Sequence, residues 1–154
     1  MLGSGGVGKA TLFTRYIYRV FIEKFDPTIE EGYRKYIEIN GKQYSLEILY
    51  THGETEYTAM RDVYIHNSEG CILVYSITDK STFNVLQEIH SEIVRIKECH
   101  PPLIIVGNKV DLEESRAVSK ESGEALAAEL SGVFMETSAK TPTNVIELFE
   151  AVQN

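Results

Sequence analysis

The chain has 154 residues, of which 43% are hydrophobic and 25% charged, and its formal net charge at neutral pH is -8. This length and composition are typical of one globular domain spanning residues 1–154. The acidic balance argues against a nucleic-acid partner, because phosphate backbones are bound by clustered Lys and Arg. Cys71 and Cys99 are too few for a disulfide framework or a zinc site. With no apolar stretch of about 20 residues and no leader pattern, we expect a cytoplasmic protein.

The first motif is "GSGGVGKAT", residues 3–11, which nearly matches the phosphate-binding pattern G-x-x-x-x-G-K-[ST]. The pattern is broken at Ala10, where a hydroxyl should hold Mg²⁺. A glycine-rich loop alone is more often an ordinary turn, but Gly8-Lys9 opening a predicted helix over residues 9–21 favours phosphate binding. Such a loop should follow a buried strand, and only two residues precede Gly3 here. We therefore expect most of the first strand to be missing from this chain.

The rest of the chain alternates predicted strands and helices. Residues 33–49 alternate apolar and polar side chains around Asn40-Gly41, which predicts an antiparallel hairpin with a primed turn. Near-continuous apolar runs predict buried parallel strands, and apolar spacing predicts helices between them. The runs are 70–77, 103–108 and 133–138, and the helices are 57–67, 81–98, 119–130 and from Asn144 onward, where Glu147 stands in capping-box spacing. This order predicts an α/β fold: a mostly parallel sheet with one antiparallel hairpin strand and helices on both faces.

Six motifs in this order carry a family resemblance. They are "GSGGVGK", "FDPTIEEGYRKY", "GETEYTAMRDVYI", "LVYSIT", "GNKVDL" and "ETSAK". Together they cover nearly the whole chain, which resembles the small GTPases of the Ras superfamily and most closely the Ras and Rap branch. The resemblance implies a P-loop NTPase-type fold, GTP and GDP as ligands with Mg²⁺ as cofactor, and a monomeric signalling switch. The implied partners are effector proteins, guanine-nucleotide exchange factors and GTPase-activating proteins.

The resemblance also assigns roles to residues of the nucleotide site. Lys9 matches the amine that reaches the β- and γ-phosphates, and Phe21 matches the aromatic beside the base or ribose. Asp111 matches the carboxylate that accepts from the guanine N1 and N2 donors, which adenine cannot supply. Taken singly, each polar position could be an ordinary surface-loop residue and Phe21 a core aromatic, but their joint placement after predicted strands favours the functional interpretation. The nucleotide-binding set implied is Gly3, Gly5, Gly6, Val7, Gly8, Lys9, Ala10, Thr11, Phe21, Thr28, Asn108, Lys109, Asp111, Ser138, Ala139 and Lys140.

The metal and hydrolysis positions depart from the family pattern. Ala10 offers a methyl in place of a ligand hydroxyl, and Tyr50 stands where the family's D-x-x-G begins with a metal-holding aspartate. Thr28 is then the one usual metal contact left, so Mg²⁺ binding is expected to be weak or absent. Glu54 stands where the family has a water-positioning residue, and its carboxylate is negatively charged like the γ-phosphate, so the two repel each other. The catalytic set is reduced to Lys9, Gly53 and Glu54, and very slow GTP hydrolysis is expected.

The sequence allows two interpretations of the role of His52. A histidine beside Gly53 could serve as a replacement general base, because its side chain titrates near neutral pH. The less specific reading, a solvated histidine of a switch loop, is favoured because the family holds an alanine here in a tight turn.

The effector-binding segment keeps the family pattern better than the catalytic one. Glu30 and Glu31 lie beside a predicted strand edge, an arrangement that adds a strand to a partner's sheet and meets its basic residues. An ordinary solvated acidic strand is the alternative. The set implied is Phe25, Asp26, Pro27, Thr28, Ile29, Glu30, Glu31, Gly32 and Tyr33. The closing "LFEAVQN" contains neither a C-a-a-X box nor a polybasic tail, so we expect no encoded lipid anchor, and membrane association only if a C-terminal tail is missing from this chain.

The sequence is compatible with three hypotheses about the function. The first is a Ras/Rap-like GTP-binding switch with impaired Mg²⁺ coordination and very slow hydrolysis. The second is a pseudo-GTPase, an interaction module that binds effectors or exchange factors without turnover. The third is a degraded gene product that lacks its first strand and barely folds. Ala10 and Tyr50 favour the second reading, whereas the complete "NKVD" motif at Asn108 to Asp111 favours the first.

Overall fold

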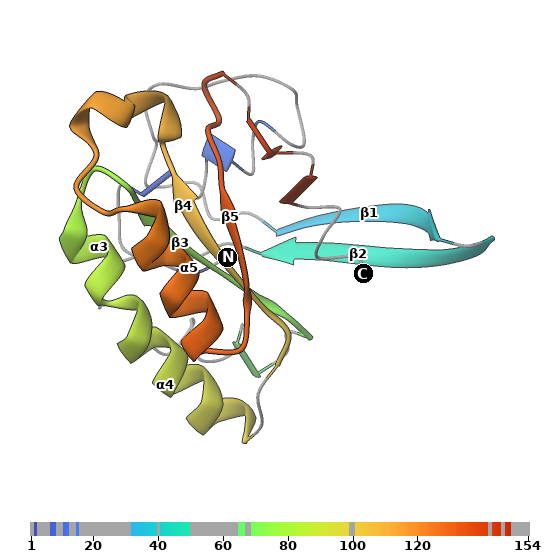
Figure 1. Cartoon of the computed structure of the whole chain (residues 1–154). Helices are drawn as coiled ribbons and strands as arrows, with labels where there is room; N and C mark the ends of the chain where they lie inside the picture. The colour runs from blue at the N-terminus through green and yellow to red at the C-terminus, as the bar shows by residue number, and fades with distance from the viewer. Residues whose placement is uncertain are drawn as a thin grey trace.

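The computed structural model describes the C-terminal half of the chain most completely. The described residues are 2, 7–8, 11–12, 15, 32–39, 41–49, 65–66, 69–98, 101–141, 143–145 and 147–148, with the backbone alone for strands 32–39 and 42–49. These ranges are sufficient to establish a parallel sheet, its helices and a separate hairpin (Figure 1).

Three parallel strands form the centre of the molecule. They are β3 (Cys71–Ser76), β4 (Leu103–Asn108) and β5 (Val133–Glu136), in the order β3-β4-β5. All six residues of β3 and all six of β4 are buried, which explains their continuous apolar runs. The parallel pairing brings the carboxyl ends of β3 and β4 together, because Ser76 lies opposite Asn108. The strands expected at 70–77 and 103–108 are confirmed, and the strand expected at 133–138 is present but ends at Glu136.

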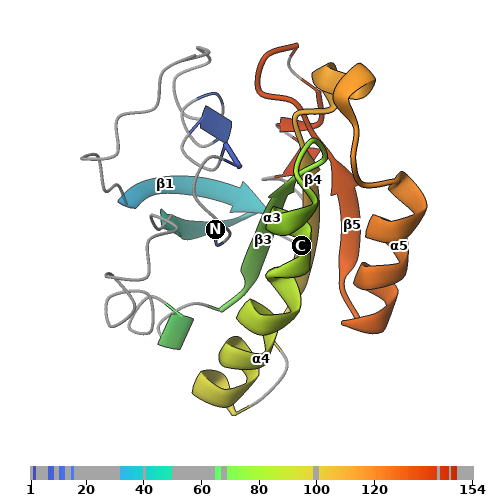
Figure 2. The same cartoon turned by 90° about the vertical axis from the view of Figure 1, so that its left-hand side faces the viewer.

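Helices α4 and α5 cover one face of this sheet and lie side by side (Figures 1 and 2). Helix α5 (Lys120–Glu129) begins where the Ser119 hydroxyl accepts from the Ser122 amide, so the predicted helix over 119–130 is confirmed. The amide of Gln87 on α4 (Leu86–Lys97) donates to Glu129 of α5 at 3.4 Å.

The prediction of a single helix over 81–98 is wrong in one respect. This segment is divided into α3 (Lys80–Asn84) and α4, which meet at Val85. The Val85 amide donates to the Phe83 carbonyl, and this interrupts the regular hydrogen-bond ladder at that residue. Asp79 caps α3 by accepting from the Ser81 amide at 3.0 Å, so the helix begins one residue earlier than expected.

The predicted hairpin is also present. Strands β1 (Gly32–Ile39) and β2 (Lys42–Leu49) pair antiparallel, with Ile39 opposite Lys42, so the connecting loop has two residues. Gly41 in this loop has φ +81, as a primed turn requires. Among the described residues, the hairpin forms a two-stranded sheet of its own rather than an antiparallel strand of the β3-β4-β5 sheet.

The edge of β3 opposite β4 is occupied by Leu2. Its amide donates to the Ile72 carbonyl and its carbonyl accepts from the Val74 amide, both at 2.8 Å, in a parallel bridge opposite Leu73. Leu2 is 5% exposed and belongs to the main hydrophobic core. In the described residues, the strand expected before the phosphate loop is therefore represented only by the parallel bridge of Leu2 with Leu73.

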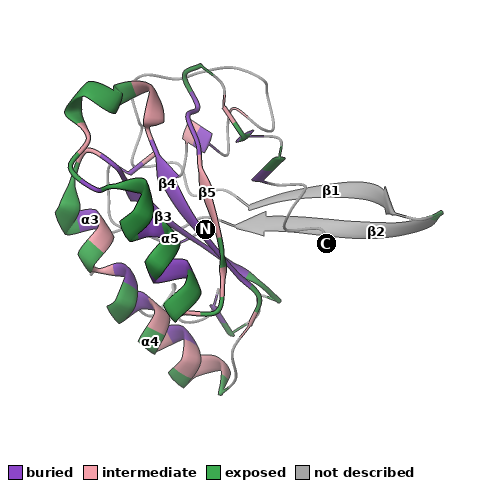
Figure 3. Cartoon of the chain, in the orientation of Figure 1, coloured by how far each residue is buried: buried purple, intermediate pink, exposed green. Residues whose placement is uncertain are grey.

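The core lies between the sheet and helices α3 to α5, and Figure 3 shows buried residues on the strands and on the helices that cover them. Leu73, Ile105, Leu86 and Ile93 are fully buried in it. The second layer of helices, expected at 9–21 and from Asn144 onward, is described only at its first residues, and the helix expected at 57–67 only at Ile65 and His66. Within the described stretches, no helix combines the length and the apolar character needed to cross a membrane.

Candidate nucleotide-binding site

The end of the phosphate loop is a tight turn that opens a helix. Gly8 has φ +98, a conformation that favours glycine, and its carbonyl accepts from the Leu12 amide at 2.9 Å. Val7, just before it, is fully buried. The helical first turn expected after the loop is confirmed at Thr11 and Leu12. The amides at the start of such a helix attract anions.

Asn108, the last residue of β4, joins this turn to the next strand. Its side-chain amide donates to the Val7 carbonyl at 2.8 Å, and its side-chain oxygen accepts from the Thr137 hydroxyl at 2.9 Å. Asn108 is 2% exposed and Thr137 is fully buried, so both bonds are shielded from water. The phosphate-loop turn, β4 and the segment after β5 are thereby held together.

The backbone turns sharply after Asn108. Lys109 has φ +69, a left-handed conformation, and the next amide, of Val110, donates to the Thr137 carbonyl at 3.1 Å. A short 3₁₀ helix, η2 (Val110–Ser115), follows and carries Asp111. The Lys109 stem lies close to Gly8, since a Cβ on Gly8 would be 3.9 Å from the Lys109 Cε.

Asp111 is held by the loop after β5. The Ser138 hydroxyl donates to Asp111 Oδ1 at 2.6 Å, and Ser138 is itself fully buried. A carboxylate has about four lone-pair positions, so this one bond leaves acceptor capacity for the donors of a ligand. Ser138 also pairs with Thr143 through two backbone hydrogen bonds of 3.0 and 2.8 Å, which closes the loop that holds buried Ala139 and exposed Lys140.

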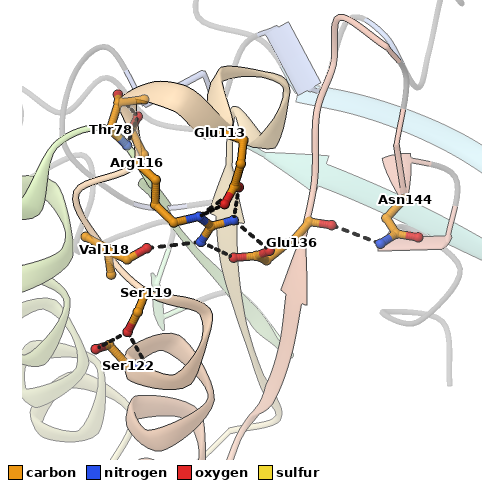
Figure 4. A network of polar contacts seen from close by, with 9 residues as sticks. Thr78, Glu113, Arg116, Val118, Ser119, Ser122, Glu136 and Asn144 are labelled. Carbon is orange, nitrogen blue, oxygen red and sulfur yellow. Dashed lines mark hydrogen bonds and ion pairs between the residues drawn. The ribbon is translucent and has the colours of Figure 1, made fainter.

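An ionic network lies beside these loops (Figure 4). The Arg116 guanidinium donates to both oxygens of Glu136 and to the carboxylate of Glu113. The hydrogen bond to Glu136, and then that to Glu113, raises the pKa of Arg116 above its ordinary value. The hydrogen bond from Arg116 holds the pKa of Glu113 below its ordinary value. Asn144, whose spacing suggested a helix cap, uses its side-chain amide to donate to the Glu136 carbonyl at 2.9 Å.

The structure therefore brings together three predicted motifs from distant parts of the chain: Val7-Gly8, Asn108 to Asp111, and Ser138 to Lys140. Of the effector-binding set, Gly32 and Tyr33 begin strand β1. The predicted positions that lie outside the described residues are Gly3, Gly5, Gly6, Lys9, Ala10, Phe21, Phe25, Asp26, Pro27, Thr28, Ile29, Glu30, Glu31, Tyr50, His52, Gly53 and Glu54.

Three residues of the network are not indicated by the sequence motifs as site residues: Thr137, Arg116 and Glu136. Thr137 stands inside the quoted "ETSAK" motif, so its position was visible although its bond to Asn108 was not. Arg116 and Glu136 are separated by 20 residues, and no local pattern links them.

The described residues include two features that a nucleotide can use. The partly buried Asp111 carboxylate keeps acceptor capacity, and the side-chain-free turn at Gly8 leaves room for phosphates at a helix start. No group of three His, Cys, Asp or Glu side chains gathers as a metal site in the described ranges. The positions that the resemblance assigns to Mg²⁺ lie outside them.

A family model gives the assignment. The model of the Ras family matches residues 1–154, which is the whole chain. Proteins of this family bind GTP and GDP with Mg²⁺ and interact with effectors, exchange factors and GTPase-activating proteins. The chain is a member of the Ras family of small GTP-binding signalling proteins.

Proposed function

We propose that this chain is a Ras/Rap-type switch protein that binds GDP and GTP selectively, coordinates Mg²⁺ poorly and hydrolyses GTP very slowly. The observation that carries the proposal is the buried hydrogen-bonded chain from Val7 through Asn108 to Thr137, with Asp111 tied to Ser138 beside it. This chain of contacts connects a phosphate-binding turn with the two loops that the resemblance assigns to guanine.

Base selection rests on Asp111. Guanine presents two neighbouring N–H donors that one carboxylate accepts, whereas adenine presents no donor at its N1 and no amino group at C2. The bond from Ser138 fixes the orientation of this carboxylate. A site built to pair polar groups rejects a ligand that lacks them, because its own buried groups would then be left unpaired.

Weak metal coordination rests on two substitutions in the sequence. A bound Mg²⁺ bridges phosphate oxygens and neutralises charge that develops during phosphoryl transfer. Ala10 supplies no oxygen, and Tyr50 supplies a neutral phenol where the family pattern has a carboxylate, so Thr28 remains the main candidate ligand. Glu54 adds a negative charge near the expected γ-phosphate position, which opposes the developing charge rather than stabilising it.

The same substitutions favour a second candidate, a pseudo-GTPase that engages effectors or exchange factors without turnover. Its support is the contrast between a degenerate metal and hydrolysis set and a well-preserved acidic segment from Phe25 to Tyr33. A protein of this type would occupy its partner in one lasting state, because no hydrolysis step would release it.

Extraction of nucleotide from the purified protein tests the proposal. The protein is prepared with and without Mg²⁺, denatured, and its released nucleotides are separated and quantified. We expect guanine nucleotide in both preparations at similar occupancy. Absence of nucleotide, or recovery of adenine nucleotide, would contradict the proposed base selection. Asp111→Ala is the matched variant, and it should yield markedly less guanine nucleotide.

Single-turnover hydrolysis separates the two candidates. Each missing group should slow the reaction by about tenfold or more, or roughly 1.4 kcal/mol in the barrier, and the effects should not add simply because they act on one site. The combined variant Ala10→Ser, Tyr50→Asp and Glu54→Gln should regain hydrolysis, while Ala10→Ser alone should chiefly restore Mg²⁺ dependence of binding. A slow but measurable rate in the unmodified protein favours the switch, whereas no detectable hydrolysis favours the pseudo-GTPase. An ordinary intrinsic rate contradicts the slow hydrolysis of the first candidate as well as the pseudo-GTPase, and His52 or Glu54 is then the first residue to test as a base.

A further inference from the structure

Arg116 and Glu136 form a two-pronged ion pair between the segment after Asp111 and the strand before Ser138 (Figure 4). Arg116 Nη1 donates to Glu136 Oε2 at 2.8 Å, and Nη2 donates to Oε1 at 3.1 Å. Both side chains are largely shielded, at 17% and 16% exposed. The planar guanidinium donates two parallel hydrogen bonds to the carboxylate, which fixes the relative orientation of the two side chains as well as their separation. A lysine cannot reproduce this two-bond geometry, called the fork below.

The same guanidinium gathers the loop between η2 and α5. Its Nε donates to the Glu113 carboxylate at 2.8 Å, and its Nη1 also donates to the Val118 carbonyl at 3.0 Å. One side chain thus connects the end of η2, the start of the α5 region and strand β5. Because η2 carries Asp111, displacement of this loop would displace the carboxylate proposed to read the base.

Glu136 is fixed from its other side as well. Its backbone carbonyl accepts from the Asn144 amide at 2.9 Å, and the next two residues make the bonds that define the site. Thr137 donates to Asn108, and Ser138 donates to Asp111. The position of Glu136 therefore sets where the Ser138 hydroxyl meets Asp111.

We propose that Arg116 is a positioning residue for guanine recognition, which holds η2 and the end of β5 in the register that presents Asp111 to the base. This inference rests on the proposed guanine-nucleotide function. Arg116 acts through Glu136 and Ser138 and has no direct contact with the base or the phosphates. Its loss would leave the shielded Glu136 carboxylate without its cation, so that Glu136 would move toward water and the end of β5 with it.

The test compares GDP with IDP, whose base is guanine without the 2-amino group. Affinities of both nucleotides are measured for the unmodified protein and for Arg116→Ala by competition against a fluorescent nucleotide. Because a hydrogen bond to a charged acceptor is lost with IDP, the unmodified protein should prefer GDP by about tenfold or more. In Arg116→Ala the GDP affinity should fall more than the IDP affinity, so that the preference shrinks to less than about half its value.

Three further variants make the test selective. Ile93→Val perturbs a fully buried residue of α4 that is absent from the ion-pair network, and it should lower the melting temperature while keeping the GDP preference. Glu113→Gln removes the charge of the exposed partner and keeps the Glu136 fork, so the preference should persist. If Arg116→Ala does not fold, Arg116→Lys serves instead, because it keeps the charge and loses the fork.

Equal losses of GDP and IDP affinity in Arg116→Ala, or an unchanged preference, would overturn the positioning role while leaving the proposed function standing. No GDP preference in the unmodified protein would overturn both. A preference that shrinks in Arg116→Ala and Arg116→Lys but persists in Ile93→Val and Glu113→Gln supports the positioning role.

Discussion

Gly8 and Asn108 are packed so closely that a Cβ on Gly8 would overlap the Asn108 side-chain amide. That amide donates to the Val7 carbonyl, so the phosphate-loop turn and the end of β4 form one unit. Position 8 must therefore lack a side chain for two reasons, which are its left-handed backbone and the presence of Asn108.

Gly8→Ala should therefore destabilise the protein and weaken nucleotide binding. Left-handed backbone strain costs about 1–2 kcal/mol for an alanine, and displacement of Asn108 adds to it. Gly41→Ala is the matched control, because Gly41 has φ +81 but nothing lies within 4 Å of a Cβ there. Urea unfolding should show a larger loss for Gly8→Ala, and only that variant should lose GDP affinity. Equal losses of stability in the two variants would refute the packing argument.

Thr137→Val should cost more than its small change in shape suggests. The hydroxyl donates to Asn108 inside the core, and valine would leave the Asn108 oxygen buried without that donor. The expected loss of unfolding free energy is about 1–3 kcal/mol. Thr137→Ser keeps the hydroxyl and removes one methyl, which costs about 0.8 kcal/mol. Guanine affinity should fall in the valine variant and persist in the serine variant; the reverse order would show that the hydroxyl does not orient Asn108.

Tyr75 should make the protein lose stability in alkaline solution. Its hydroxyl is buried without a hydrogen-bond partner in the described structure, and burial, followed by the nearby Glu136 charge, raises its pKa above the ordinary 10.0. Below pH 10.0 Tyr75 is protonated in both the folded and the unfolded state, so its ionisation takes nothing from the free energy of unfolding. As the pH rises above 10.0 the unfolded chain ionises first, and stability falls. Burial also raises the pKa of the Cys71 thiol above its ordinary value of 9.0. This thiol therefore adds a second decline of stability with rising pH, which begins near pH 9.0.

Tyr75→Phe provides the measurement. Urea unfolding across about pH 7 to 11 should show a shallower alkaline decline in the variant than in the unmodified protein. At neutral pH the variant should gain about 1 kcal/mol, because an unpartnered hydroxyl leaves the core while the edge-to-face contact with Phe83 remains. An unchanged alkaline slope, or a loss of stability at neutral pH, would show that the hydroxyl is satisfied in solution.

Much of the sheet could be predicted from the sequence because its signals are local. Strands β3 and β4 are buried on every residue and therefore read as unbroken apolar runs, and Asn40-Gly41 identifies the hairpin through the backbone that glycine permits. The start of α5 could be placed because Ser119 is a capping residue. Val85 could not be recognised as a break, since the apolar spacing continues through it into α4.

The candidate site was predictable as a set of motifs but not as a network. The motif around Asn108 indicated that this residue belongs to the site, but its bonds to Val7 and Thr137 join residues 101 and 29 positions away. The Arg116–Glu136 pair likewise depends on how η2 folds back on β5, which no local pattern encodes. Such tertiary contacts become visible only when the loops at the end of the sheet are placed in space.

The most direct test of the account is the affinity for GDP and for ADP, each measured with Mg²⁺ and with EDTA. Fluorescent nucleotide titration gives all four values on one protein preparation. Because Asp111 reads the base while Ala10 and Tyr50 remove metal contacts, GDP should bind far more tightly than ADP, and EDTA should change the GDP affinity little. Comparable affinities for GDP and ADP, or a large loss of GDP affinity on chelation, would contradict it.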